Sequence, residues 1–110
     1  MFQEQHISMI RNGTKTQTRR VWKRWHVRVG GVYAMRTRLF GHGSEPRGWI
    51  RVTERREEPL GQISAADARA EGRYTVDEFA RVWERINGWW DPYERVAVVT
   101  FEYVGEVRPN

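Results

Sequence analysis

One short basic segment, Gly13-Thr-Lys-Thr-Gln-Thr-Arg-Arg20, holds the residues best able to do chemistry. Thr18 is a candidate covalent nucleophile, but an unassisted hydroxyl reacts weakly near neutral pH and needs a base. Lys15 lies three residues earlier, and its amine can be that base where burial or neighbouring cations lower its pKa. Arg20 carries a planar fork of donors suited to a phosphate or carbonyl oxygen. The alternative is a surface turn whose threonines bond only local backbone.

The segment lies in a stretch of forty residues without a carboxylate. Residues 5–44 hold nine Lys or Arg and no Asp or Glu, whereas residues 45–110 hold ten basic and thirteen acidic residues. The net charge of +5 is therefore sorted along the chain, which favours contact with a polyanion. Tryptophans between the cations suit base stacking. We expect contacts with RNA or substrate from Arg19, Arg20, Trp22, Lys23, Arg24, Trp25 and Arg28.

Length and composition exclude several classes of protein. At 110 residues the chain has the size of one domain, and we expect residues 1–110 to form it. The absence of cysteine excludes disulfides, thiolate nucleophiles and zinc–thiolate sites. No apolar run approaches the roughly 20 residues of a membrane span, and residues 2–5 lack the pattern of a signal peptide. We expect a cytoplasmic protein without membrane contact, a monomer by default.

Three helices are expected around the reactive segment. An apolar stripe over residues 2–10 predicts a helix that stops at Asn12-Gly13, so the segment follows a helix C-terminus. Ser64 can cap a short helix that Gly72 ends. A capping box at Thr75-x-x-Glu78 begins another helix, which Gly88 closes.

Strand patterns complete the expected fold. Alternating or dense apolar runs predict strands at residues 32–40, 49–54 and 96–104, with shorter ones near 18–22 and 55–60. Five or six short strands close most easily into a barrel that hides its edges. We predict a small α+β barrel of five to six strands, with the N-terminal helix and a two-helix insert packed outside.

The pattern Gly13-x-Lys15-x-x-Thr18-x-Arg20 resembles the signature of the ASCH domain family, which is related to the PUA RNA-binding barrels. Two later blocks resemble the same family. They are Ala68-Arg-Ala-Glu-Gly72 and Tyr74-Thr-x-x-Glu-Phe79 with Trp83, followed by a final strand through Val99-Thr-Phe101. The resemblance spans nearly the whole chain and implies a PUA-like barrel.

The resemblance also implies an activity. Some family members hydrolyse the amide of 4-acetylcytidine with a Lys, a Thr and a Glu of these blocks, which correspond here to Lys15, Thr18 and Glu71. In that reading Thr18 attacks the acyl carbonyl, Lys15 takes its proton, and Glu71 orients the lysine or carries a proton to the leaving amine. Segment amides or Arg20 would stabilise the oxyanion. A surface ion pair is the alternative role for Glu71.

Neither cofactor nor metal is expected. The neutral amine leaves without metal assistance, and the three histidines show no ligand spacing. His6 would line the pocket from the first helix or pack against the barrel.

Two further functions remain open. Family members thought to be RNA-binding modules suggest a non-catalytic role for the basic residues 11–38, and a Lys/Thr/Glu cluster near phosphate could support ribonuclease activity. The charge favours RNA, while the intact Lys15, Thr18 and Glu71 set favours an amidohydrolase. The expected partner is a nucleoside, a nucleotide or single-stranded RNA.

Overall fold

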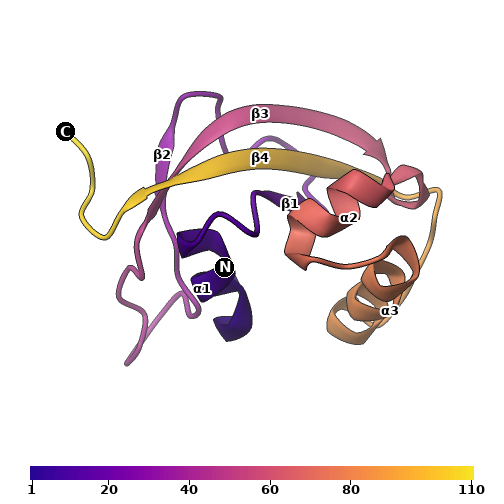
Figure 1. The fold of residues 1–110 in the computed structure, drawn as a ribbon, viewed down its shortest axis with the longest axis horizontal. Coiled ribbons are helices and arrows are strands. Elements are labelled where there is room, and N and C mark those ends of the chain that lie inside the picture. Colours follow the sequence, from indigo (N-terminus) through magenta and orange to yellow (C-terminus); the bar gives the residue numbers. More distant parts are fainter.

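A computed structural model describes all 110 residues and contains three α-helices and four strands. Figure 1 shows two long strands arching across the molecule, one helix beside them and two helices at one end. In chain order the elements are α1 (Glu4–Arg11), β1 (Gln17–Arg20), β2 (Val32–Ala34), β3 (Trp49–Pro59), a 3-10 turn (Leu60–Gln62), α2 (Ala65–Gly72), α3 (Val76–Asn87) and β4 (Arg95–Gly105).

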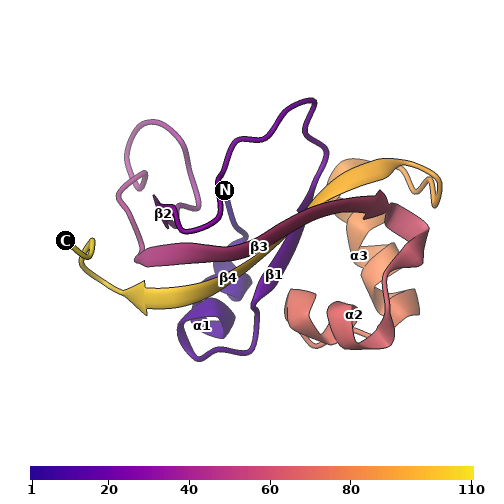
Figure 2. The same cartoon turned by 90° about the horizontal axis from the view of Figure 1, so that it is seen from above.

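The strands form one antiparallel sheet in the order β1-β4-β3-β2. Strands β3 and β4 run side by side along most of their length, as Figure 2 shows from above. Their register shifts between Val52 and Glu54, and such an irregularity bends a strand and increases its twist. The sheet therefore curls into a half-barrel and leaves β1 as a short edge strand.

Local sequence signals begin and end the helices as predicted, except at the end of α2. There Gly72 is the last helical residue and packs closely against Tyr74, while Arg73 takes the left-handed conformation with φ 65°. The Ser64 side chain accepts a hydrogen bond from the Asp67 amide at the start of α2. Thr75 and Glu78 form both bonds of a capping box at the start of α3. Helix α1 ends at Arg11, and Gly13 then adopts φ +83°, a conformation that suits glycine. The reactive segment therefore does follow a helix C-terminus.

Two apolar clusters hold the helices to the sheet. One packs α1 against the sheet and contains Ile7, Ile10, Met35, Ile50, Val52, Val99 and Phe101. The other packs α2 and α3 and contains Leu60, Ile63, Ala68, Phe79, Trp83, Val96 and Val98. Strand β4 supplies both clusters, and its residues 96–99 are all buried, as predicted for a strand covered on both faces at one end. The clusters leave a cleft between α1 and α3.

The α+β class is confirmed, but the sheet has four strands instead of five or six. The pattern expected to form separate strands at 49–54 and 55–60 is one continuous strand, because the bulge near Val52 absorbs the break in alternation. The strand expected over 32–40 ends at Ala34. Beyond it Leu39 and Phe40 are exposed in a loop, so their apolar character does not reflect strand packing.

Leu60→Ala is expected to destabilise the protein by about 3 kcal/mol, because the Leu60 side chain is fully buried where the helices meet the sheet. Urea unfolding measures this change. Leu39→Ala is the matched control, since Leu39 is 59% exposed and its truncation should change stability by less than about 0.5 kcal/mol. Equal effects of the two substitutions would contradict the assigned core.

Candidate functional site

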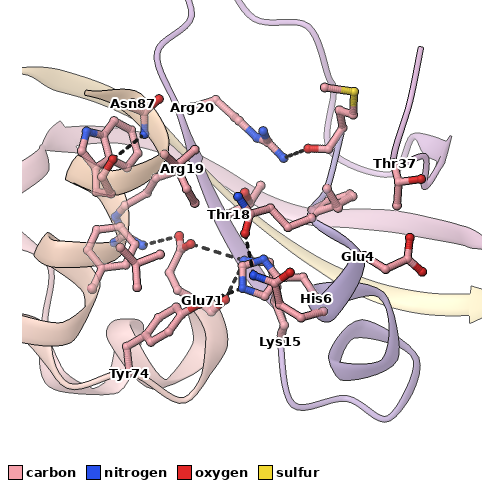
Figure 3. A pocket seen from close by; sticks show the side chains of 18 of the residues that line it. Glu4, His6, Lys15, Thr18, Arg19, Arg20, Thr37, Glu71, Tyr74 and Asn87 are labelled. Carbon is pink, nitrogen blue, oxygen red and sulfur yellow. Dashed lines mark hydrogen bonds and ion pairs between the residues drawn. The ribbon is translucent and has the colours of Figure 1, made fainter. Parts of the chain in front are cut away.

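A cleft of about 920 Å³ opens along the free edge of β1, between α1 on one side and α2 and α3 on the other. Figure 3 shows Glu71 near its centre, between Tyr74 and Arg19 on one side and His6 and Lys15 on the other. Residues lining the cleft include Phe2, His6, Lys15, Thr18, Arg19, Arg20, Trp22, Thr37, Arg38, Glu71, Tyr74, Phe79, Trp83 and Asn87.

Lys15 is buried at the inner wall of the cleft. Its Nζ donates to the Gln17 carbonyl at 2.8 Å and to the Glu71 carbonyl at 2.6 Å, and it lies 3.4 Å from Glu71 Oε1. Burial lowers the pKa of Lys15, and the charge of Arg20 lowers it further, while the Glu71 carboxylate partly opposes both. The site thus favours the neutral amine more than water does, as a general base requires.

Arg19 holds the Glu71 carboxylate in place from the buried side of the cleft. Its side chain is fully buried, and its Nη1 donates to Glu71 Oε2 at 3.0 Å and to Gln17 Oε1 at 2.6 Å. Its Nη2 contacts Glu58 Oε1 at 2.9 Å and Asp67 Oδ2 at 3.3 Å. The same two carboxylates bind Arg56, so cations and carboxylates interleave in one cluster. The cluster holds the Glu71 carboxylate beside Lys15.

The alternation of β1 sorts its side chains into two sets. Gln17 and Arg19 are buried toward α2, whereas Thr18 and Arg20 are half-buried on the opposite face. Arg20 donates from Nη2 to the Met1 carbonyl at 2.6 Å and lies over the Phe2 ring, 5.2 Å from its centroid. Thr18 and Arg20 therefore enter the cleft together.

His6 and Tyr74 form a neutral pair across the cleft. His6 Nε2 lies 2.9 Å from the Tyr74 hydroxyl. Burial, together with the charges of Lys15 and Arg20, lowers the pKa of His6 to about 4, and burial raises the pKa of Tyr74. The pair links α1 to the segment between α2 and α3 and presents uncharged polar groups beside Lys15.

Aromatic side chains line two sides of the cleft. Phe79 and Trp83 of α3 are almost fully buried, with ring centroids 6.1 Å apart, whereas the partly buried Trp22 and Phe2 line the side that includes α1. Sequence reasoning did not assign roles to Tyr74, Phe79 or Trp83, although all three lie in blocks that resemble the family. The 3.6-residue period of α3 signalled only that Phe79 and Trp83 are buried, which packing alone explains.

The structure brings together seven of the residues expected in the site: His6, Lys15, Thr18, Arg19, Arg20, Trp22 and Glu71. Lys23, Arg24 and Arg28 are instead exposed on the loop between β1 and β2 and do not line the cleft. Trp25 also lies outside, with the Arg55 guanidinium 4.6 Å from its ring centroid. Arg19 was expected to contact phosphate at the surface, but it is buried among carboxylates, because alternation directs it toward α2.

No group of His, Asp or Glu side chains is arranged to hold a metal ion. None of the helices is both long and apolar enough to cross a membrane.

No family model and no curated protein sequence matches the chain at a significant level. Two crystal structures resemble it in fold. A protein from Enterococcus faecalis V583, described with the family model DUF984, superposes with a TM-score of 0.70 at 20% identity over 96% of this chain and 74% of that one. An ASCH domain from Lactobacillus crispatus JV V101 gives 0.64 at 15% identity over 90% and 70%.

These similarities show the class of fold, a small α+β domain built on a curled antiparallel sheet. More narrowly, the chain has the fold of an ASCH domain, as the sequence analysis predicted.

The lowered pKa of His6 leads to a prediction about how the stability of the protein depends on pH. Its folded pKa of about 4 lies below the ordinary value of 6.5, so the unfolded chain binds more protons as the pH falls between these values. The contribution of neutral His6 is therefore present above pH 6.5 and lost as the pH falls toward 4. Urea unfolding at several pH values should show a shallower loss in His6→Gln than in wild type. Parallel profiles would contradict this prediction.

Proposed function

We propose that this protein is a metal-independent amidohydrolase that removes the acyl group from N4-acetylcytidine or a related acylated pyrimidine nucleoside or nucleotide. The observation that carries the proposal is the buried contact of Lys15 with Glu71 in a cleft that Thr18 also lines. A surface turn, the alternative for this segment, does not bury a lysine beside a carboxylate that is itself buried.

The contacts of Lys15 support a role in proton transfer. Two backbone carbonyls accept short hydrogen bonds from Nζ, so they orient two of its three N–H directions. The third position lies toward Glu71 Oε1 at the longer distance of 3.4 Å. In the ammonium form this position holds a proton that the Glu71 carboxylate stabilises. To take the Thr18 proton, the neutral amine must turn its lone pair toward Thr18, and the contact with Glu71 Oε1 is the longest and therefore the weakest of the three that it would give up.

The proposed reaction begins when Thr18 Oγ1 attacks the acyl carbon and its proton passes to Lys15 Nζ. The tetrahedral intermediate collapses as the C–N bond breaks, and Lys15 returns the proton to the leaving N4 amine. Water then attacks the acyl ester of Thr18 and gives one proton to Lys15, which passes it to the Thr18 oxygen as acetic acid leaves and releases its own proton to solvent. Glu71, fixed by Arg19, stabilises the ammonium form between these steps.

The edge position of β1 supports oxyanion binding by backbone. The Gln17 carbonyl points away from β4, since Lys15 Nζ binds it. In an antiparallel pair the N–H two residues later points the same way, which assigns the Arg19 amide to this side of the strand. The proposal gives this amide the role of oxyanion donor next to Lys15.

Thr18→Ala and Lys15→Met are each expected to reduce acetate release from N4-acetylcytidine at least about a thousandfold, because they remove the nucleophile and the base. Thr14→Ala is the matched control, since Thr14 belongs to the same segment but does not line the cleft. Chromatography of the cytidine product measures the rates. Full activity in Thr18→Ala, or no activity in wild type, would refute the proposal.

RNA binding is a second candidate function, and the loop between β1 and β2 favours it. Lys23, Arg24 and Arg28 are exposed there, and none of them pairs with a carboxylate. The ring of Trp22 packs at a tilt against the ring of His26 in the same loop, with centroids 4.9 Å apart. Exposed cations beside aromatic rings suit a single strand, whose phosphates and bases they contact separately.

If this loop binds single-stranded RNA, the logarithm of the affinity should fall linearly with the logarithm of salt concentration, with a slope of about −0.7 per phosphate contacted. Replacing Lys23, Arg24 and Arg28 with Gln should make that slope shallower by about 2. Fluorescence anisotropy with a labelled oligonucleotide measures both. The charge-matched control replaces three exposed cations of the helical side, Arg73, Arg81 and Arg85. A flat salt response would exclude this function.

A further inference from the structure

Arg20 is a partly buried cation of the cleft that forms no ion pair. Lys15 and Arg19 both pair with Glu71, whereas Arg20 pairs with no carboxylate. Its one hydrogen bond goes to the neutral Met1 carbonyl, and its one aromatic neighbour is Phe2. Buried charges in proteins are normally paired, because an unpaired charge loses its hydration without replacement. Arg20 therefore has donors and charge to offer a ligand.

The carboxylates of the cleft cannot supply the missing partner. Glu71 is bound by Lys15 and Arg19. Glu4, the other carboxylate that lines the cleft, is held by both terminal nitrogens of Arg47, which lies outside it. Arg38, which is exposed, also lines the cleft and forms no ion pair. The lining of the cleft thus includes two guanidinium groups without a carboxylate partner.

From this imbalance we propose that the cleft binds a phosphate monoester, so that its ligand is a pyrimidine nucleotide and not the free nucleoside. A monoester carries nearly two negative charges on three oxygens, which matches two separate guanidiniums better than a single carboxylate does. The inference rests on the proposed function for the nature of the base.

The dimensions of the cleft agree with a nucleotide. Its volume of about 920 Å³ is near the upper end of the range of about 300–1,000 Å³ typical of small-molecule sites. The partly buried Trp22 lines the cleft and offers a ring for a base, and Arg20 lies two residues before it in the chain. A nucleotide can therefore place its base on Trp22 and its phosphate at Arg20.

Arg20 is assigned here to the phosphate and not to the oxyanion of the reaction, and the two roles differ in what a substitution does. An oxyanion donor acts on every substrate alike, so its loss lowers the rates for nucleoside and nucleotide equally. A phosphate ligand acts only on substrates that carry the phosphate. Arg20 also lowers the pKa of Lys15, so Arg20→Gln should lower both rates, but it should lower the nucleotide rate more and so remove the preference for nucleotide.

Binding of cytidine 5′-monophosphate and of cytidine tests the proposal without requiring hydrolysis. Trp22 and Trp83 line the cleft, so tryptophan fluorescence can follow both titrations. Wild type should bind the monophosphate at least about tenfold more tightly, as expected for charge-assisted hydrogen bonds. Arg20→Gln should bind the two alike, and Arg20→Lys should fall between. Arg95→Gln, which removes an exposed cation outside the cleft, should behave as wild type.

Equal affinities in wild type, or a phosphate preference that survives in a folded Arg20→Gln protein, would overturn the assignment. Tighter binding of a dinucleotide with only an internal phosphodiester than of the monophosphate would also overturn it, in favour of an RNA strand. Thermal unfolding of each variant verifies that it is folded. Failure of the amidohydrolase would appear separately, as absent acetate release from both acetylated substrates while the monophosphate still binds.

Discussion

The candidate site depends on one buried charge cluster. Arg19 has no exposed side-chain surface and contacts Glu58, Asp67 and Glu71, while Lys15 and Arg56 supply the remaining positive charge. Three cations thus meet three carboxylates. Desolvating such groups is costly, and their attraction offsets the cost only when every partner is in place. The cluster therefore joins β1, β3 and α2 in one arrangement and determines where Glu71 and Lys15 lie.

The cleft follows from the same arrangement. Because β1 pairs only with β4, its other edge remains open, and the Gln17 carbonyl on that edge binds Lys15. Alternation then separates the two arginines of β1, with Arg19 buried as a support and Arg20 facing the cleft. Neighbours in the sequence with the same side chain thus have opposite roles, one in holding the site and one in meeting a ligand.

Much of the fold was predictable because its signals are local. The caps at Ser64 and Thr75, the stop at Gly13 and the buried run of β4 all correspond to elements in the structure. The number of strands was not predictable, since a bulge near Val52 lets one strand continue where the pattern breaks. The strand predicted through Leu39 and Phe40 was wrong, because an apolar pattern in the sequence does not show whether other side chains pack against it, and both residues are exposed.

The sequence by itself determined the α+β class, the three helices and a segment in which Lys15 and Thr18 are three residues apart. Those features depend on propensities and spacings within a few residues. Only the tertiary structure decided that Glu71, fifty-six residues after Lys15, reaches its ammonium group, that Arg19 is buried, and that Arg20 has no carboxylate partner. Whether a side chain is buried and whether its charge is paired depends on groups that are distant in the chain. These groups meet only once the sheet has curled and the helices have packed.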